Sequence, residues 1–157
     1  MRLSDFVVRE AILPKLAATT KDAAIREMVE SLRASGHLKN GEQENIIKAI
    51  MKREQLGSTG IGRGVAIPHT KHESADRLIG TVAVSQQGVP FDSLDGEPVF
   101  ILIMLISPQD RPGEHLRALE NVSRNLRDDT FCRFLLQVST REDIWELLAE
   151  VDQSGPK

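Results

Sequence analysis

The first third of the chain repeats apolar residues every three or four positions, which is the period of an amphipathic α-helix. A helix is predicted between Thr20 and Gly36, because threonine is a favourable N-cap residue and glycine often ends a helix. A second helix is predicted to begin after an N-cap at Asn40 and to end at Leu56-Gly57. The apolar faces of these helices carry Ala24, Ile25, Met28, Val29, Leu32, Ile46, Ile47, Ile50 and Met51.

The middle of the chain changes to short runs of β-branched and apolar residues, which predict strands. Strands are expected over 65–68, 78–85 and 98–107, and the unbroken apolar character of the third indicates burial on both faces. A glycine-rich loop is expected over 57–64, before the first strand. Turns are expected over 86–90 and at Asp95-Gly96.

Helical periodicity returns in the last third of the chain. Helices are predicted over about 114–127 and about 128–137, and Thr140 begins a third with a sequence that resembles a capping box. Residues 152–157 are expected to form a frayed tail. The inward face of the helix over 114–127 is expected to carry Leu116, Leu119, Val122, Ser123 and Leu126. This order of helices, strands and helices predicts a helix-covered α/β fold, with residues 1–157 as a single domain whose core spans about 3–150.

Composition and charge exclude several classes of protein. A net charge of −3 without a basic stripe argues against a nucleic-acid partner. The longest apolar run, Val99–Ile106, is too short for membrane insertion, and no signal peptide follows Met1. The one cysteine, Cys132, excludes an internal disulfide and a cysteine-rich zinc site, and it is compatible with the reducing cytoplasm in which we expect the protein.

His69 is the first candidate for chemistry, because it follows Pro68 where the predicted strand stops. A neutral imidazole is a competent nucleophile near pH 7, and functional groups are commonly placed on loops beside a rigid sheet. A histidine that merely bonds a nearby carbonyl is the structural alternative. His69 and His72 could also be read as a pair of metal ligands, but no further ligands at suitable spacing support that interpretation. No metal or cofactor is expected.

The segment before His69 offers several groups that could hold a phosphoryl group. Glycine amides can approach an anion closely, hydroxyls can donate, and the guanidinium of Arg53 suits phosphate geometry. The loop residues considered for this role are Gly57, Ser58, Thr59, Gly60, Gly62 and Gly64. A plain tight turn is the alternative. The loop is neither a Walker A motif nor a dinucleotide fingerprint, since no Gly-Lys-Ser/Thr follows and a strand comes after it.

His115 is the second candidate, in the first turn of the helix after the most apolar strand. Loops that join strands to helices gather at one edge of a parallel sheet, so His69 and His115 could meet there. One imidazole could then carry the phosphoryl group while the other orients it. A surface residue at a helix start is the alternative for His115.

The stretch from Arg53 to His69, REQLGSTGIGRGVAIPH, resembles the active-site signature of enzyme IIA domains of the bacterial phosphoenolpyruvate-dependent phosphotransferase system. The similarity is to the fructose/mannitol class, which includes the nitrogen-regulatory IIA proteins. Residues 91–99 and the segment Gly113-Glu-His115-Leu-Arg-Ala-Leu resemble the same family, and the resemblance covers roughly residues 3–150.

This resemblance implies a mixed five-stranded sheet flanked by helices and a phosphotransferase component without a cofactor. It implies that His69 accepts a phosphoryl group from the phosphocarrier HPr or a paralogue, with Arg53 and His115 beside it. Two roles remain open. The protein could regulate a kinase or transporter through its phosphorylation state, or it could pass the group to the cysteine of a IIB domain for sugar uptake. The chain carries no IIB, IIC or HPr segment, which favours the regulatory role.

Overall fold

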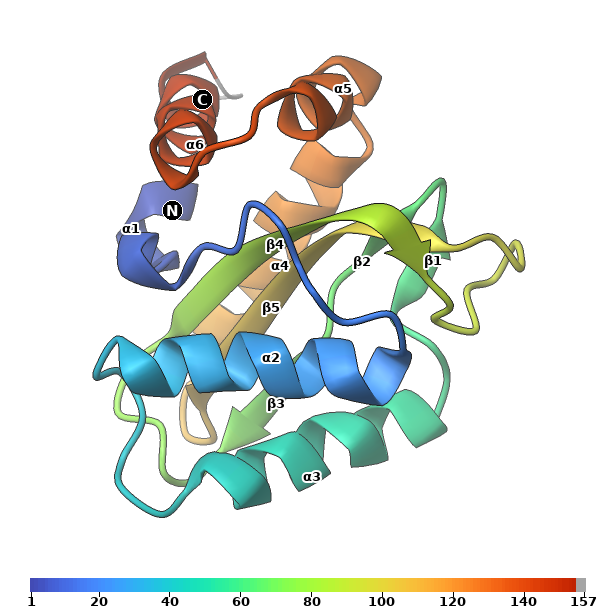
Figure 1. The fold of residues 1–157 in the computed structure, drawn as a ribbon. Helices are drawn as coiled ribbons and strands as arrows, with labels where there is room; N and C mark the ends of the chain where they lie inside the picture. The colour runs from blue at the N-terminus through green and yellow to red at the C-terminus, as the bar shows by residue number, and fades with distance from the viewer. Residues whose placement is uncertain (155–157) are drawn as a thin grey trace.

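The computed structural model describes residues 1–154. Two short turns of helix, α1 (Leu3–Phe6) and the 3₁₀ segment η1 (Arg9–Ala11), precede two longer helices, α2 (Lys21–Ala34) and α3 (Gln43–Gln55). Five strands follow, and they are β1 (Gly60–Gly62), β2 (Val65–Ala66), β3 (His69–His72), β4 (Ile79–Val89) and β5 (Val99–Pro108). The chain ends with α4 (Pro112–Leu126), α5 (Asp129–Gln137) and α6 (Arg141–Ser154). Figure 1 shows this order from blue to red.

The strands form one mixed sheet around β5, as the family resemblance implies. β4 pairs with one edge of β5 in antiparallel orientation, whereas β2 and β3 run parallel to its other edge and β1 pairs antiparallel with β2. β2 and β3 keep the same register, because Val65 lies opposite Ile101 and His69 lies opposite Leu105. The chain therefore continues along β5 past Pro68, which interrupts the ladder because proline has no N–H to donate.

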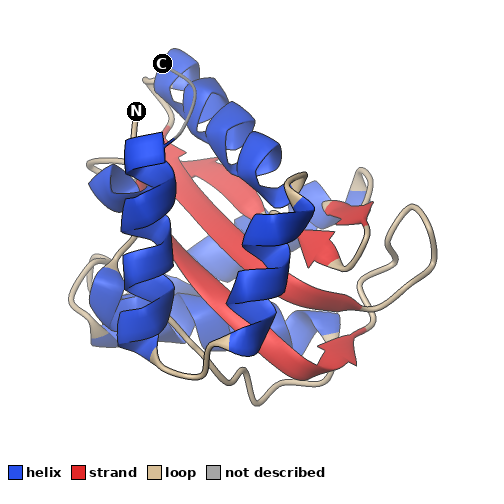
Figure 2. Cartoon of the chain, turned by 90° about the horizontal axis from the view of Figure 1, so that it is seen from above, coloured by secondary structure: helices blue, strands red, loops and turns tan. Residues whose placement is uncertain are grey.

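Helices cover both faces of this sheet (Figure 2). β5 supplies side chains to the cores on both faces. Successive residues of a strand point to opposite faces. Leu102, Met104 and Ile106 accordingly lie in the core under α2 and α3, and alternate residues lie in the core under α1, α4, α5 and α6. The burial on both faces that was predicted for the strand over 98–107, which is β5, is confirmed.

Two helix boundaries show which sequence signals held. Thr20 caps α2 as predicted, since its hydroxyl accepts the N–H of Ala23 at 3.2 Å. The prediction of Asn40 as a cap was wrong. α3 begins at Gln43 with Glu42 in the N-cap position, while Asn40 and Gly41 form a turn that Gly41 permits with its positive φ of 82°.

Four other boundaries differ from the prediction. The loop expected over 57–64 contains β1, and the turn expected over 86–90 is an irregularity inside β4, where Gly88 takes a φ of 88° while the strand continues to Val89. The buried stripe of α4 starts with His115 and leaves Leu116 57% exposed. Helix α6 runs through Asp152 to Ser154, so the tail is helical further than expected, and residues 155–157 lie outside the described part.

The helices of residues 1–154 are all too short or too polar to span a bilayer.

Candidate functional site

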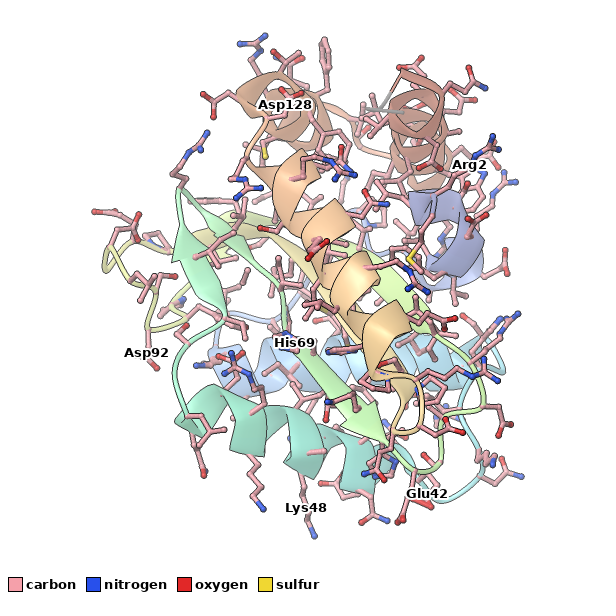
Figure 3. The ribbon with its side chains drawn as sticks, turned by 180° about the vertical axis from the view of Figure 1, so that it is seen from behind. Arg2, Glu42, Lys48, His69, Asp92 and Asp128 are labelled. Atoms are coloured by element: carbon pink, nitrogen blue, oxygen red, sulfur yellow. The ribbon has the colours of Figure 1, made fainter. Side chains whose placement is uncertain are left out.

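His69 is the first residue of β3, at the side of the sheet that lies between α3 and α4 (Figure 3). The expectation of a histidine at the end of a strand was therefore wrong in detail, because the chain resumes pairing with β5 immediately after Pro68. An open pocket of about 700 Å³ lies beside it. The pocket is lined by Arg53, His69, Thr70, Lys71, Gln109, His115 and Leu119.

His69 and His115 meet in this pocket. The centres of their rings are 5.5 Å apart and the rings are tilted by 51°. Parallel pairing brings this about, because β3 and β5 run in the same direction and α4 starts just beyond the end of β5. The structure thus brings together the two histidines that the sequence could only suggest as neighbours.

One nitrogen of His69 is occupied by the backbone. Its Nδ1 lies 2.7 Å from the carbonyl oxygen of Ile67. A carbonyl only accepts, so Nδ1 carries the hydrogen and donates it. Burial lowers the pKa of His69, the nearby Arg53 cation lowers it further, and the Ile67 carbonyl opposes both. At pH 7 the ring is therefore neutral, and Nε2 holds the lone pair.

His115 is 7% exposed, although it stands in the first turn of a helix. Burial lowers its pKa to about 4, with further lowering from the charge of His69 and of Lys71. Its Nδ1 lies within hydrogen-bonding distance of the hydroxyl of Ser107, a fully buried residue of β5. The sequence alternative of a solvated helix-start residue is excluded for His115.

Arg53 lies at the end of α3 and lines the same pocket. One guanidinium nitrogen, Nη1, donates to the carbonyl oxygen of Gly57 at 2.8 Å, four residues further along the chain. A guanidinium has five N–H groups in a fixed fork, so this bond, the one that Arg53 makes among residues 1–154, leaves others for an anion. Arg53 is thus held at its helix end with donors to spare beside His69.

The loop groups considered as phosphoryl donors are largely used in holding the loop itself. The Ser58 hydroxyl donates to the carbonyl of Phe91 at 2.6 Å, and the hydroxyl of Thr59 donates to Glu54. Three amides also have partners, since those of Gly57, Thr59 and Gly60 donate to Glu54 O, Glu54 Oε1 and Ser58 Oγ. None of Gly57, Ser58, Thr59, Gly60, Gly62 and Gly64 lines the pocket beside His69. A tight turn held by its own hydrogen bonds therefore describes this loop better than a phosphate-binding loop does.

Sequence reasoning missed three residues of the site. Lys71 was findable, because residues two apart on a strand share a face, and Lys71 lines the pocket with His69. Glu54 and Ser107 gave no such signal. Glu54 reads as a solvated helix residue beside Arg53 but is only 6% exposed, and Ser107 reads as the end of an apolar run.

The other histidines have local roles. His72 Nδ1 accepts the N–H of Ser74 at 3.1 Å, and His37 Nδ1 lies 2.9 Å from the carbonyl of Ser35. His69 and His72 are three positions apart in one strand, so their side chains leave opposite faces. Within residues 1–154, no group of His, Cys, Asp and Glu side chains is arranged to hold a metal ion.

Comparison with known proteins of similar sequence and fold points to one family. The model of the phosphoenolpyruvate-dependent sugar phosphotransferase system, EIIA 2, matches residues 5–151. The nitrogen regulatory protein of Bradyrhizobium diazoefficiens is 32% identical over 149 residues, which are 95% of each chain.

Solved structures agree with this assignment. The nitrogen regulatory protein IIA-Ntr of Neisseria meningitidis superposes with a TM-score of 0.84 at 27% identity, covering 93% of this chain and 98% of that one. The fold also matches, at a TM-score of 0.73 and 24% identity, the IIA mannitol enzyme of Escherichia coli in its complex with phosphorylated IIB, over 90% of this chain and 95% of that one. Members of this family act as phosphotransfer components. The chain therefore belongs to the EIIA 2 family of the phosphoenolpyruvate-dependent sugar phosphotransferase system.

Proposed function

We propose that this protein is a phosphohistidine carrier that accepts a phosphoryl group on Nε2 of His69 from HPr or a paralogous phosphocarrier. The observation that carries the proposal is the hydrogen bond from His69 Nδ1 to the carbonyl of Ile67. It keeps the ring hydrogen on Nδ1, so that the lone pair of the neutral ring is on Nε2, and His69 lines an open pocket. The bond from His69 to a carbonyl, which could have been a purely structural contact, thus sets the tautomer that the transfer needs.

The transfer needs little covalent help from the protein. Nε2 of His69 attacks the phosphorus of the donor phosphohistidine, a new P–N bond forms, and the old P–N bond breaks with its electron pair returning to the donor ring. Positioning and charge neutralisation supply most of the catalysis in such transfers. The cations of Arg53 and Lys71 line the same pocket and favour the incoming negative charge.

The regulatory role is favoured over sugar transport. The Bradyrhizobium relative is a nitrogen regulatory protein, and the match covers 95% of both chains. Phosphorylation adds about −1.5 to −2 charges at pH 7, which suits a switch in the binding of a kinase, a transporter or another protein in the cytoplasm. Transfer to the cysteine of a IIB domain is the alternative, supported by the fold shared with the mannitol IIA that binds phosphorylated IIB.

The test is incubation with phosphoenolpyruvate, enzyme I and HPr or a paralogue, followed by intact mass and mapping of acid-labile phosphate. We expect one phosphate on Nε2 of His69 and none on His69→Ala. Retained acid-labile phosphate on that variant would move the acceptor site elsewhere. Failure of every phosphocarrier to label the wild type would leave a binding protein with the family fold.

Two further variants separate acceptance from transfer. Arg53→Ala is expected to slow labelling of His69 about tenfold or more, because a charge-assisted bond to the phosphoryl group is lost. His115→Ala is expected to accept the group but to pass it on poorly. Arg26→Ala is the matched control for Arg53, since Arg26 lies on an exposed helix face and, within residues 1–154, pairs with Asp22 and Glu44 alone. Equal labelling rates for Arg53→Ala and Arg26→Ala would remove Arg53 from the site.

A further inference from the structure

Ser107 is a buried polar residue in the most apolar strand of the sheet. Its side chain has no exposure to solvent, and its neighbours along β5 are Ile106 and Pro108. Among the described residues, its hydroxyl has a single hydrogen-bonding partner, Nδ1 of His115. A buried hydroxyl is costly without a partner, so this one contact decides where its hydrogen goes.

The hydrogen between the two groups can belong to either of them. If His115 carried a hydrogen on Nδ1 and donated it, the Ser107 hydroxyl hydrogen would have no acceptor among residues 1–154. If the hydroxyl donates to Nδ1, the serine donor and the imidazole acceptor are both satisfied. A neutral imidazole that accepts at Nδ1 has its hydrogen on Nε2.

The geometry points to Ser107 as a positioning residue that holds His115 in the tautomer with hydrogen on Nε2, so that His115 can donate to the phosphoryl group on His69. Burial keeps His115 neutral at pH 7, because its pKa is lowered to about 4, so the tautomer matters. The two histidines are then complementary. His69 donates through Nδ1 to Ile67 and offers a lone pair at Nε2, while His115 accepts at Nδ1 and offers a hydrogen at Nε2.

With the opposite tautomer, His115 would turn a lone pair toward the same pocket. That lone pair would repel the phosphoryl oxygens on a neighbour whose ring centre is 5.5 Å away. A preorganised donor aimed at developing charge is the usual way in which a site stabilises a transferred group. The role of the donor rests on the proposed phosphorylation of His69, whereas the tautomer of His115 is a property of the unphosphorylated protein.

The first experiment reads the tautomer directly. Nitrogen-15 NMR of the imidazole rings in the unphosphorylated wild type, assigned with His115→Gln, is expected to show His115 with hydrogen on Nε2 and an unprotonated, hydrogen-bonded Nδ1. In Ser107→Ala, the Nδ1 signal is expected to move to that of a nitrogen without a donor, and Ser107→Thr is expected to restore the wild-type pattern. A wild-type His115 with hydrogen on Nδ1 would overturn the inference, whatever happens at His69.

The second experiment reads the consequence. Ser107→Ala is expected to slow phosphoryl transfer from HPr, or onward from phosphorylated His69, about tenfold, the effect of one well-placed hydrogen bond. Ser107→Thr should recover most of this rate. Ser85→Ala is the matched control, because Ser85 is a buried strand serine whose hydroxyl, in the described part of the chain, accepts the N–H of Gly88 and does not contact the site. The rate of Ser85→Ala should match that of the wild type. Equal rates for Ser107→Ala and Ser85→Ala would refute the role. No labelling of any variant or of the wild type would refute the phosphocarrier proposal and leave the NMR result standing.

Discussion

A neutral pair of histidines can lie close together in a place where two imidazolium ions could not. Burial lowers the pKa of His69 and of His115, and the cations of Arg53 and Lys71 act in the same direction, each on one of the two rings. The cations therefore have two effects in this pocket. Arg53 helps burial to keep the acceptor ring of His69 uncharged before transfer, and both cations favour the phosphoryl group after it.

The same pKa shift makes the stability of the protein depend on pH. The pKa of His115 is about 4 in the folded protein and 6.5 as an ordinary histidine, so between these values the unfolded chain binds more protons. The contribution of neutral His115 to the free energy of unfolding is fully present above pH 6.5 and is lost as the pH falls toward 4. Over this window we expect the free energy of unfolding of the wild type to fall by roughly 1–3 kcal/mol more than that of His115→Gln. Urea unfolding at several pH values measures it, and parallel curves for the two proteins would contradict the shift.

At the scale of the elements, Glu54 ties together two helices and the loop that leads to His69. Its Oε1 lies 2.8 Å from Lys21 Nζ at the start of α2 and accepts the N–H of Thr59 at 3.1 Å. The carbonyl of Thr59 accepts the N–H of Ile67 at 3.1 Å. Ile67 is the residue whose carbonyl orients His69, so the network runs from α2 to the acceptor ring.

Loss of Glu54 should therefore be costly. Glu54→Ala removes the nearer carboxylate from the largely buried Lys21, which keeps only the longer contacts to Asp92 and the Phe91 carbonyl among the described residues, and it frees two donors of Thr59. We expect the free energy of unfolding to fall by about 2–4 kcal/mol. Glu54→Gln keeps an acceptor for Thr59 and should lose less. Urea unfolding at pH 7 measures both. Glu44→Ala is the control, because its pair with Arg26 is exposed, and its midpoint should stay near that of the wild type. A Glu54→Ala midpoint equal to that of Glu44→Ala would show that the network adds no stability.

The types of the elements were predictable from periodicity, whereas predicted boundaries were wrong where backbone geometry decided them. The continuous apolar run of β5 indicated a strand buried on both faces, and Thr20 correctly indicated the start of α2. Gly88 signals a turn in sequence but lies in a bulge, because a glycine with positive φ serves both structures. Pro68 indicated the end of a strand, although pairing with β5 resumes after one missing N–H.

The placement of the candidate residues divides in the same way. His69, His115 and Arg53 stand at element ends in the sequence, and the topology brings them to one pocket, while their roles stay predictions. The sequence did not show that Ser58 and Thr59 bond to Phe91 and Glu54. Such contacts depend on the packed structure of α3 and the segment after β4, which local sequence does not specify.

At the scale of the whole molecule, the two ends of the described chain are joined. Asp152, near the end of α6, accepts the N–H groups of Leu3 and Ser4 at 2.6 and 3.0 Å and the Ser4 hydroxyl at 2.7 Å. α1 has no side-chain cap of its own at Arg2, so a carboxylate about 150 positions away satisfies the free amides of its first turn. This contact explains why the helix persists where a frayed tail was predicted.

Asp152→Ala should loosen both ends together. We expect it to lower the free energy of unfolding by about 1–2 kcal/mol, the cost of removing a helix cap, and to speed hydrogen exchange at the amides of Leu3 and Ser4. Asp152→Asn keeps one acceptor oxygen, so its free energy of unfolding and its exchange rates should lie between those of the wild type and Asp152→Ala. Gln153→Ala, at an exposed neighbouring position, controls for changes in the helix itself. Exchange at Leu3 and Ser4 as slow in Asp152→Ala as in the wild type would mean that α1 is held by the apolar contacts of Leu3 and Phe6 alone.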